Sequence, residues 1–257
     1  MLPSNIEDAL KDLTMGRALV DVDMYTFIEH HWGCYNEWYN KYIDTGILEK
    51  FIANKSINSI VDLGANTGSI AGLLTRCVRS MNGTWPDVTL VVEPNPDNIP
   101  LLITTMQEIR AAAKAIHDHD LNIKVSNTAC LYSRNKTSSM SSMDNNRGGF
   151  FISEIKEIKK EKKDIASRGG SIVLLPFEDI LSSADISHVD LLKLDVEGAE
   201  WNIIEHSTSI KNDVDNIIIE IHDKSVEEAK EFFSAHLPMF EIISIEHEQF
   251  FLERKKE

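Results

Sequence analysis

Short, almost wholly apolar runs alternate with helical segments from residue 59 onward, and this alternation constrains the fold more than any other feature. The apolar runs predict strands at Ser59 to Gly64, Val88 to Glu93, Asn122 to Ala129, Val189 to Asp195 and Asn216 to His222. The segments between them predict helices at Ser69 to Arg79, Asp97 to His117, Ala199 to Ser207 and Ser225 to His236. Strands without a polar face, separated by helices, form a mostly parallel α/β sheet that helices cover on both faces.

The chain ends with two further apolar runs, Phe240 to Ile245 and Gln249 to Glu253, joined by a short turn. They predict an antiparallel hairpin at one edge of the sheet. A chain of 257 residues suffices for one α/β domain with short additions. We therefore place the main domain at residues 59–257, with a helical, aromatic-rich extension at 1–58 and an insertion or lid at about 132–170.

Both additions carry a local pattern. Aromatic residues between Tyr25 and Tyr42 recur at helical spacing, so several share one face. We expect that face to pack on the main domain; the alternative is a face turned toward a substrate. In the insertion, the stretch from Glu154 to Asp164 is rich in Lys and Glu, and pairs at i, i+4 can support a solvated helix there.

Composition limits the partners. The chain has 26 Lys and Arg residues against 41 Asp and Glu residues, a formal net charge of −15. A field of that sign repels nucleic acids and anionic membrane surfaces, so we expect neither as a partner. No apolar run approaches the roughly 18 residues that cross a bilayer, and the first residues lack the layout of a signal peptide. A cytoplasmic location is therefore predicted. The sequence does not indicate an oligomeric state.

The first chemical motif is Val-Asp-Leu-Gly-Ala-Asn-Thr-Gly at residues 61–68, where a strand turns into a helix. Open α/β sheets bind ligands at such turns. Gly64 permits a tight turn, and Asn66 is among the few residues other than glycine that tolerate a positive φ. The spacing G-x-x-x-G differs from the G-x-G-x-x-G of dinucleotide-binding turns. The neighbouring acid, Asp62, suits a ligand with a cationic amino group and suits a diphosphate poorly.

The second motif is Val-Val-Glu-Pro-Asn, in which Glu93 ends the second strand. A carboxylate at this place can accept two hydrogen bonds from a ribose diol. A surface acid at a strand end is the alternative interpretation. Together with the glycine turn, Glu93 predicts a crevice that binds a nucleoside.

The third motif is Leu-Leu-Lys-Leu-Asp-Val-Glu-Gly-Ala-Glu at residues 191–200. Acids at the start of a helix are favoured by the helix dipole, which explains Glu197 and Glu200 without a function. The dipole does not explain Lys193 and Asp195, because charge buried in an apolar strand is costly unless it is paired. Asp195, at the end of that strand, is well placed to position an acceptor hydroxyl or to bind a metal.

The fourth motif is Ile-Glu-Ile-His-Asp, in which Glu220 and His222 alternate with apolar residues and so point to one face. Histidine is the usual general base near neutral pH. A solvated histidine at the end of a strand is an equally acceptable interpretation.

These motifs, in this order, resemble the FkbM family of methyltransferases from about Ser59 to His222, and Lys-x-Asp-x-Glu-Gly-x-Glu is the most specific part of the resemblance. The resemblance implies a Rossmann-like class I methyltransferase fold with S-adenosyl-L-methionine as the methyl donor. It also implies methylation of oxygen, on a hydroxyl of a sugar or other small metabolite. The insertion and the aromatic extension match no motif of the family, so the resemblance does not identify the acceptor.

The resemblance also assigns residues. The methionine end of the donor would be lined by Asp62, Gly64, Ala65, Asn66 and Gly68. Glu93 would hold the ribose with Asn95 beside it, and Asn127 and Thr128 would lie near the adenine. Asp195 and Glu197 would face the site of methyl transfer.

Three hypotheses about the chemistry stay open at this point. Either Asp195 or His222 is the general base, with Glu197 orienting the acceptor and Lys193 counted among the catalytic residues. In a rival arrangement, Mg²⁺ bound by Asp195, Glu197 and Glu220 lowers the pKa of the acceptor hydroxyl. A non-catalytic nucleoside- or partner-binding module is the alternative function. A nicotinamide-dependent oxidoreductase is disfavoured by the glycine spacing and by Asp62.

Overall fold

A computed structural model describes residues 46–131, 172–246 and 248–256, together with the backbone of short strands at 136–138, 140–142 and 150–152. The predicted aromatic face between Tyr25 and Tyr42 and the Lys-rich stretch from Glu154 to Asp164 lie outside the described residues. The extension at 1–58 and the insertion at 132–170 therefore remain predictions. In the part of the chain that is described, no helix combines the length and the apolarity needed to cross a membrane.

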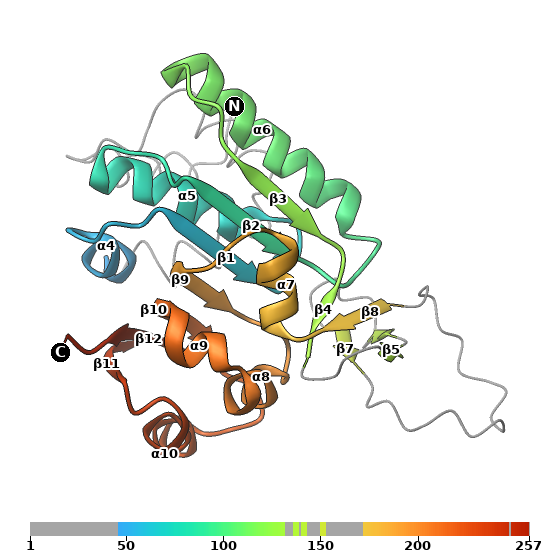
Figure 1. The fold of residues 1–257 in the computed structure, drawn as a ribbon, viewed down its shortest axis with the longest axis vertical. Coiled ribbons are helices and arrows are strands. Elements are labelled where there is room, and N and C mark those ends of the chain that lie inside the picture. The colour runs from blue at the N-terminus through green and yellow to red at the C-terminus, as the bar shows by residue number, and fades with distance from the viewer. Residues whose placement is uncertain are drawn as a thin grey trace, which may run out of the picture.

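The centre of the molecule is a seven-stranded sheet with the order β11-β12-β10-β9-β1-β2-β3 (Figure 1). Its strands are β1 (Ser59–Leu63), β2 (Val88–Val92), β3 (Ile123–Ser126), β9 (Val189–Leu194), β10 (Val214–Glu220), β11 (Phe240–Glu246) and β12 (Gln249–Arg254). Neighbouring strands from β3 to β10 are parallel, whereas β12 runs antiparallel to both β10 and β11. The predicted parallel sheet and its C-terminal antiparallel hairpin are thus confirmed.

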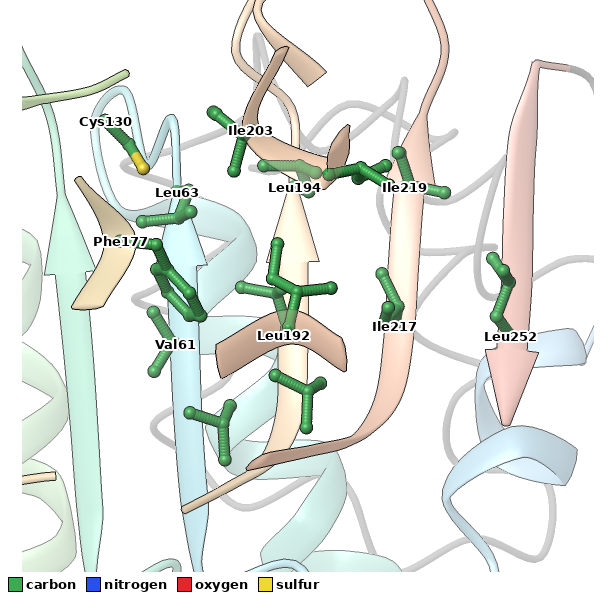
Figure 2. Close-up of a cluster of buried hydrophobic side chains, with 14 of the residues drawn as sticks. Val61, Leu63, Cys130, Phe177, Leu192, Leu194, Ile203, Ile217, Ile219 and Leu252 are labelled. Atoms are coloured by element: carbon green, nitrogen blue, oxygen red, sulfur yellow. The ribbon is translucent and has the colours of Figure 1, made fainter. Parts of the chain in front are cut away.

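Helices cover both faces of this sheet. They are α4 (Ile47–Ile52), α5 (Ser69–Asn82), α6 (Ile99–His117), α7 (Phe177–Ser183), α8 (Glu200–His206), α9 (Thr208–Asp213) and α10 (Val226–His236). One apolar core joins α4, α5 and α6 to one face, through residues such as Ile60 and Leu191. A second core joins the helices α7, α8, α9 and α10 to the other face, through strand residues such as Val61 and Leu192 (Figure 2). Because successive strand residues point to opposite faces, both faces are apolar and both need a helical cover.

One predicted element differs from the structure. The predicted strand Asn122 to Ala129 divides: β3 joins the main sheet, whereas β4 (Ala129–Cys130) pairs with β8 (Ile172–Leu175) in a smaller sheet. The break falls at Asn127, whose side-chain amide donates to the backbone carbonyls of Glu93 and Pro94 and so diverts the chain. The predicted helix Ala199 to Ser207 corresponds to α8, which ends before Ser207, and the hydroxyl of Ser207 caps the next helix, α9.

Several short elements were not predicted. They are β8, α7, α9 and three strands of the insertion, namely β5 (Lys136–Ser138), β6 (Met140–Ser142) and β7 (Phe150–Ile152). β5 pairs with β8, while β6 pairs with β7 in a two-stranded sheet. Runs this short carry too few residues for a clear apolar period.

Candidate active site

The candidate site lies where the order of the sheet reverses. From β1 the chain proceeds to β2 and β3 on one side, whereas β9 and β10 lie on the other side of β1. Open α/β sheets bind ligands at this point, beside the carboxyl ends of the strands. The loops that leave β1, β2 and β9 here begin with Gly64, Glu93 and Asp195. Three of the four predicted motifs are therefore brought together at one edge of the sheet, and the fourth joins them through His222, after β10.

The loop after β1 needs its glycines. Gly64, Asn66 and Gly68 have φ values of 84°, 50° and 84°, in the left-handed region that the sequence predicted for Asn66. A Cβ atom on Gly64 would lie 1.6 Å from the carbonyl oxygen of Asp195. At Gly68 it would lie 2.6 Å from Cδ1 of Leu102, on α6. The turn after β1 is thus in direct backbone contact with the end of β9.

Several backbone N–H groups of this loop donate hydrogen bonds to other groups of the protein. Those of Gly64 and Ala65 both donate to the carbonyl oxygen of Val92, and that of Gly68 donates to Ala65. The N–H of Asn66 donates to the carboxylate of Glu93 at 2.8 Å. A dinucleotide-binding turn instead presents free N–H groups to a diphosphate. These hydrogen bonds argue against such a ligand, as the glycine spacing did.

Glu93 holds the loops of the crevice together. Its Oε2 accepts from the N–H of Asn66, and its Oε1 accepts from the N–H of Asn95 at 2.8 Å and from the side-chain amide of Asn98 at 3.3 Å. Burial raises the pKa of Glu93, while the bonds from Asn95 and Asn66 lower it. Each carboxylate oxygen can accept more than one hydrogen bond, so a ribose diol is compatible with these bonds. Asn98, which also donates to Asn66, was not predicted; its position before α6 was the available signal.

Asp62 and Lys193 form a buried pair beneath the loop. They face each other in the register of β1 and β9, and Nζ of Lys193 lies 3.3 Å from Oδ1 of Asp62 and 3.1 Å from Oδ2 of Asp195. Burial raises the pKa of Asp62, and the charge of Lys193 opposes that shift. Asp62 is 0% exposed, so it acts on a ligand in this conformation through its field rather than by contact. Lys193 thus links the donor side of the crevice to Asp195.

Asp195, Glu197 and His222 form the opposite wall, at the ends of β9 and β10. Nε2 of His222 lies 3.6 Å from Oε2 of Glu197 and 4.0 Å from Oδ1 of Asp195, and all three side chains are partly exposed. A hydrogen bond from Nδ1 of His222 to the carboxylate of Glu200 raises the pKa of His222 to about 9, against the opposing effect of burial. Burial raises the pKa of Glu197, and His222 opposes that shift. The imidazole is therefore protonated at neutral pH and balances the acids around it.

The structure groups a different set of residues from the Mg²⁺ ligands predicted from the sequence, which were Asp195, Glu197 and Glu220. Side-chain atoms of Asp195, Glu197 and His222 lie within 4.8 Å of one another. Glu220 is not in that group, because its carboxylate accepts a hydrogen bond from Gln249 of β12 at 2.9 Å. The observed set therefore has the imidazole of His222 where the predicted set had the carboxylate of Glu220. Mg²⁺ prefers oxygen ligands, and an imidazole must lose its proton before it can bind a metal. The donor set fits Mg²⁺ poorly.

The remaining predicted residues lie in the loops that follow β1, β2 and β3. Asn127 is exposed and Thr128 partly exposed after β3, where the hydroxyl of Thr128 bonds that of Ser126. Asn95 and Ala65 are buried. Side-chain oxygen of Asn95 accepts from the N–H of Asp97, which stabilises the loop after β2. Asn95 and Ala65 thus shape the crevice, and Asn127 and Thr128 present polar groups at its rim.

A mostly parallel sheet covered by helices on both faces, with a glycine turn and acidic side chains where its strand order reverses, defines a Rossmann-like fold. The match to a family model is more specific. Residues 62–250 match the methyltransferase FkbM domain, which spans most of the chain. The chain belongs to the FkbM methyltransferase family, and it is an S-adenosylmethionine-dependent methyltransferase.

One solved FkbM structure shares this fold, and two other solved methyltransferases are similar to a lesser degree. Methyltransferase FkbM from Methylobacillus flagellatus superposes with a TM-score of 0.50 at 14% identity, over 97% of this chain and 59% of that one. A precorrin-6y C5,15-methyltransferase from Geobacter metallireducens has a TM-score of 0.42 at 11% identity, over 80% of this chain and 84% of that one. The plantazolicin methyltransferase BpumL, in complex with S-adenosylhomocysteine, has a TM-score of 0.40 at 11% identity, over 98% of this chain and 99% of that one. No curated protein sequence matches the chain.

Proposed function

We propose that this methyltransferase acts on oxygen, transferring a methyl group to a hydroxyl of a small acceptor such as a sugar or another metabolite. One observation carries the proposal: the carboxylate of Asp195 is partly exposed at the end of β9, directly beside the glycine turn that begins the donor crevice. A hydroxyl must lose a proton as it becomes methylated, and a carboxylate next to the donor can accept that proton.

The general base in this proposal is Asp195 rather than His222. The pKa of His222 is raised to about 9, so its imidazole carries a proton at neutral pH and has no free lone pair with which to accept another. Nζ of Lys193 holds Oδ2 of Asp195 at 3.1 Å and so fixes the side chain. Glu197 and His222 face Asp195 and are available to orient the acceptor.

S-adenosylmethionine, when bound, supplies an electrophilic methyl group on a sulfonium. The chain offers residues that fit it: the turn from Gly64 to Gly68 for the methionine end, Glu93 for the ribose, and Asn127 and Thr128 near the adenine. These residues include acidic side chains, and the N–H groups of their loops already donate hydrogen bonds within the protein. Both features suit S-adenosylmethionine, which is cationic and has no phosphates. Alignment of acceptor and donor in such a crevice can contribute roughly 7–11 kcal/mol to lowering the barrier.

The first test is calorimetry with S-adenosylmethionine and S-adenosylhomocysteine. We expect micromolar binding of both compounds, weakened by Glu93→Ala. Methyl-labelled S-adenosylmethionine is then incubated with a panel of hydroxylated sugars and metabolites, and NMR of the product locates the new methyl group. A methyl group on oxygen supports the proposal, whereas a methyl group on nitrogen or carbon contradicts it.

The alternative is a nucleoside- or partner-binding module on the same fold. It predicts binding of S-adenosylhomocysteine with no transfer to any acceptor of the panel. The group of Asp195, Glu197 and His222 favours the enzyme, since a scaffold has little use for three partly exposed ionisable side chains close together.

A further inference from the structure

Glu200 is a buried charge that the proposed chemistry does not use. It is the first residue of α8 and is 0% exposed. Stabilisation by the helix dipole explains an acid at this place, but it does not explain complete burial, which costs free energy unless the charge is paired. The partners of Glu200 therefore indicate what the charge is for.

One group of partners lies in the turn that carries Glu197. Oε1 of Glu200 accepts from the N–H of Val196 at 2.9 Å, and Oε2 accepts from the N–H of Gly198 at 3.0 Å. In this turn Glu197 has a φ of 53° and Gly198 a φ of 96°. A left-handed conformation is unfavourable for glutamate and persists where surrounding contacts enforce it. Glu200 supplies such contacts on both sides of Glu197.

The other partner comes from a different part of the chain. Nδ1 of His222 lies 3.0 Å from Oε1 of Glu200, and the indole N–H of Trp201 donates to the backbone carbonyl of His222 at 2.9 Å. The first two residues of α8 thus hold the side chain and the backbone of His222. With Nδ1 bound to a carboxylate, the other ring nitrogen, Nε2, is turned toward Glu197 and Asp195.

We propose that Glu200 is a positioning residue, which fixes the imidazole of His222 through Nδ1 so that Nε2 faces the acceptor side of the crevice. The inference rests on the proposed function, because it assigns His222 to the wall where transfer takes place. Glu200 itself touches no reacting group. Its effect passes through His222 and, secondarily, through the turn that carries Glu197.

The direct test is NMR of protein labelled with ¹⁵N-histidine, in complex with S-adenosylhomocysteine. In the native protein we expect a slowly exchanging Nδ1 proton on His222, assigned by its disappearance in His222→Asn. Glu200→Gln should remove or strongly shift this signal, because it replaces the charged acceptor of the Nδ1 proton with a neutral amide, whose hydrogen bond is weaker. An unchanged signal in Glu200→Gln overturns the inference.

The catalytic consequence is tested by a double-mutant cycle in the methyl transfer assay. Glu200→Gln should lower kcat about 10- to 100-fold with little change in the KM for S-adenosylmethionine. In the His222→Asn background the same change should cost little more, since residues that act as a unit are not additive. Additive losses would mean that Glu200 acts through the turn alone and would overturn its role in positioning His222.

A matched control is Glu178→Gln. Glu178 also accepts backbone N–H groups at the start of a helix, from Thr208 and Ser209 of α9. We expect its kcat to be unchanged even if its melting temperature falls. If Glu200→Gln does not fold, Glu200→Asp replaces it, because it keeps the charge and withdraws the carboxylate by one methylene. If the native protein fails to bind S-adenosylhomocysteine, the proposed function is contradicted. If it binds, but the Nδ1 signal of His222 does not change when Glu200 is substituted, this inference alone is contradicted.

Discussion

The two walls of the crevice use their acidic residues differently. On the donor side, Asp62 and Glu93 are buried and are paired with Lys193 and with amide N–H groups of neighbouring loops. On the transfer side, Asp195 and Glu197 remain partly exposed around a protonated imidazole. The acids that we propose for the donor wall are thus held by partners within the protein, whereas those that we propose for the transfer wall keep their charges accessible. Preorganisation suits the binding of one constant donor, and accessible charge suits chemistry on an acceptor.

The sharpest test of this contrast is Asp195→Asn. If the transfer wall carries out methyl transfer and the donor wall only binds S-adenosylmethionine, the kcat of this variant should fall about 10²- to 10⁴-fold. It should bind S-adenosylhomocysteine with native affinity by calorimetry. Asp87→Asn, an exposed acid at the far end of β2, is the matched control and should leave both quantities unchanged. Native turnover in Asp195→Asn would remove Asp195 as the base.

Glu93→Ala tests the donor wall. It leaves the N–H groups of Asn66 and Asn95 in a buried place without their acceptor, and each such group costs about 1–3 kcal/mol. We therefore expect a lower free energy of unfolding in urea together with weaker donor binding. Glu231→Ala, on the exposed face of α10, should change stability by less than about 0.5 kcal/mol. Weaker binding at native stability would mean that Glu93 serves the ligand and not the loops.

Gly64→Ala tests the contact between the two walls. The new Cβ would overlap the carbonyl oxygen of Asp195, and forced overpacking costs roughly 1–3 kcal/mol. Gly83→Ala is the control, because Gly83 also has a positive φ, 75°, but a Cβ atom there would lie 3.9 Å from Nη1 of Arg79, an ordinary van der Waals contact. Both variants carry the conformational strain, and only the first carries the overlap. Equal losses in urea denaturation would contradict a close contact between the walls.

The smallest expected effect is a pH dependence of stability that comes from the transfer wall. The pKa of His222 is raised from 6.5 to about 9, mainly by Glu200, with Asp195 and Glu197 adding to it. A raised pKa means that the folded state binds the proton more tightly. The stabilisation is therefore complete below about pH 6.5 and is lost as the pH rises through about 9.

Urea denaturation of native protein and His222→Asn measures this effect as the difference between the two at each pH. We expect about 1 kcal/mol more stability for the native protein at pH 6 than at pH 9.5, because partial exposure and salt screen the charges. A difference that is constant with pH would show that the imidazole is not held as a cation.

Local sequence anticipated much of the donor wall. The positive φ of Asn66 followed from its place in a glycine turn, and the need of Lys193 for a charged partner followed from its apolar neighbours. The break at Asn127 was not anticipated, because it depends on carbonyl groups of the loop after β2, more than thirty residues away. The partner of Glu200 was missed for a similar reason, since the helix dipole already explained an acid there and His222 lies on another strand.

The sequence by itself determined the fold class and the residues at the ends of the strands, because apolar period and strand length are local properties of the chain. The tertiary structure decided which of those residues meet. The register of β1 against β9 set Asp62 opposite Lys193, and the pairing of β10 with β12 set Glu220 beside Gln249. The packing of α8 against the end of β10 placed Glu200 under His222. Such contacts depend on register and on how distant elements pack, and these are properties of the whole fold.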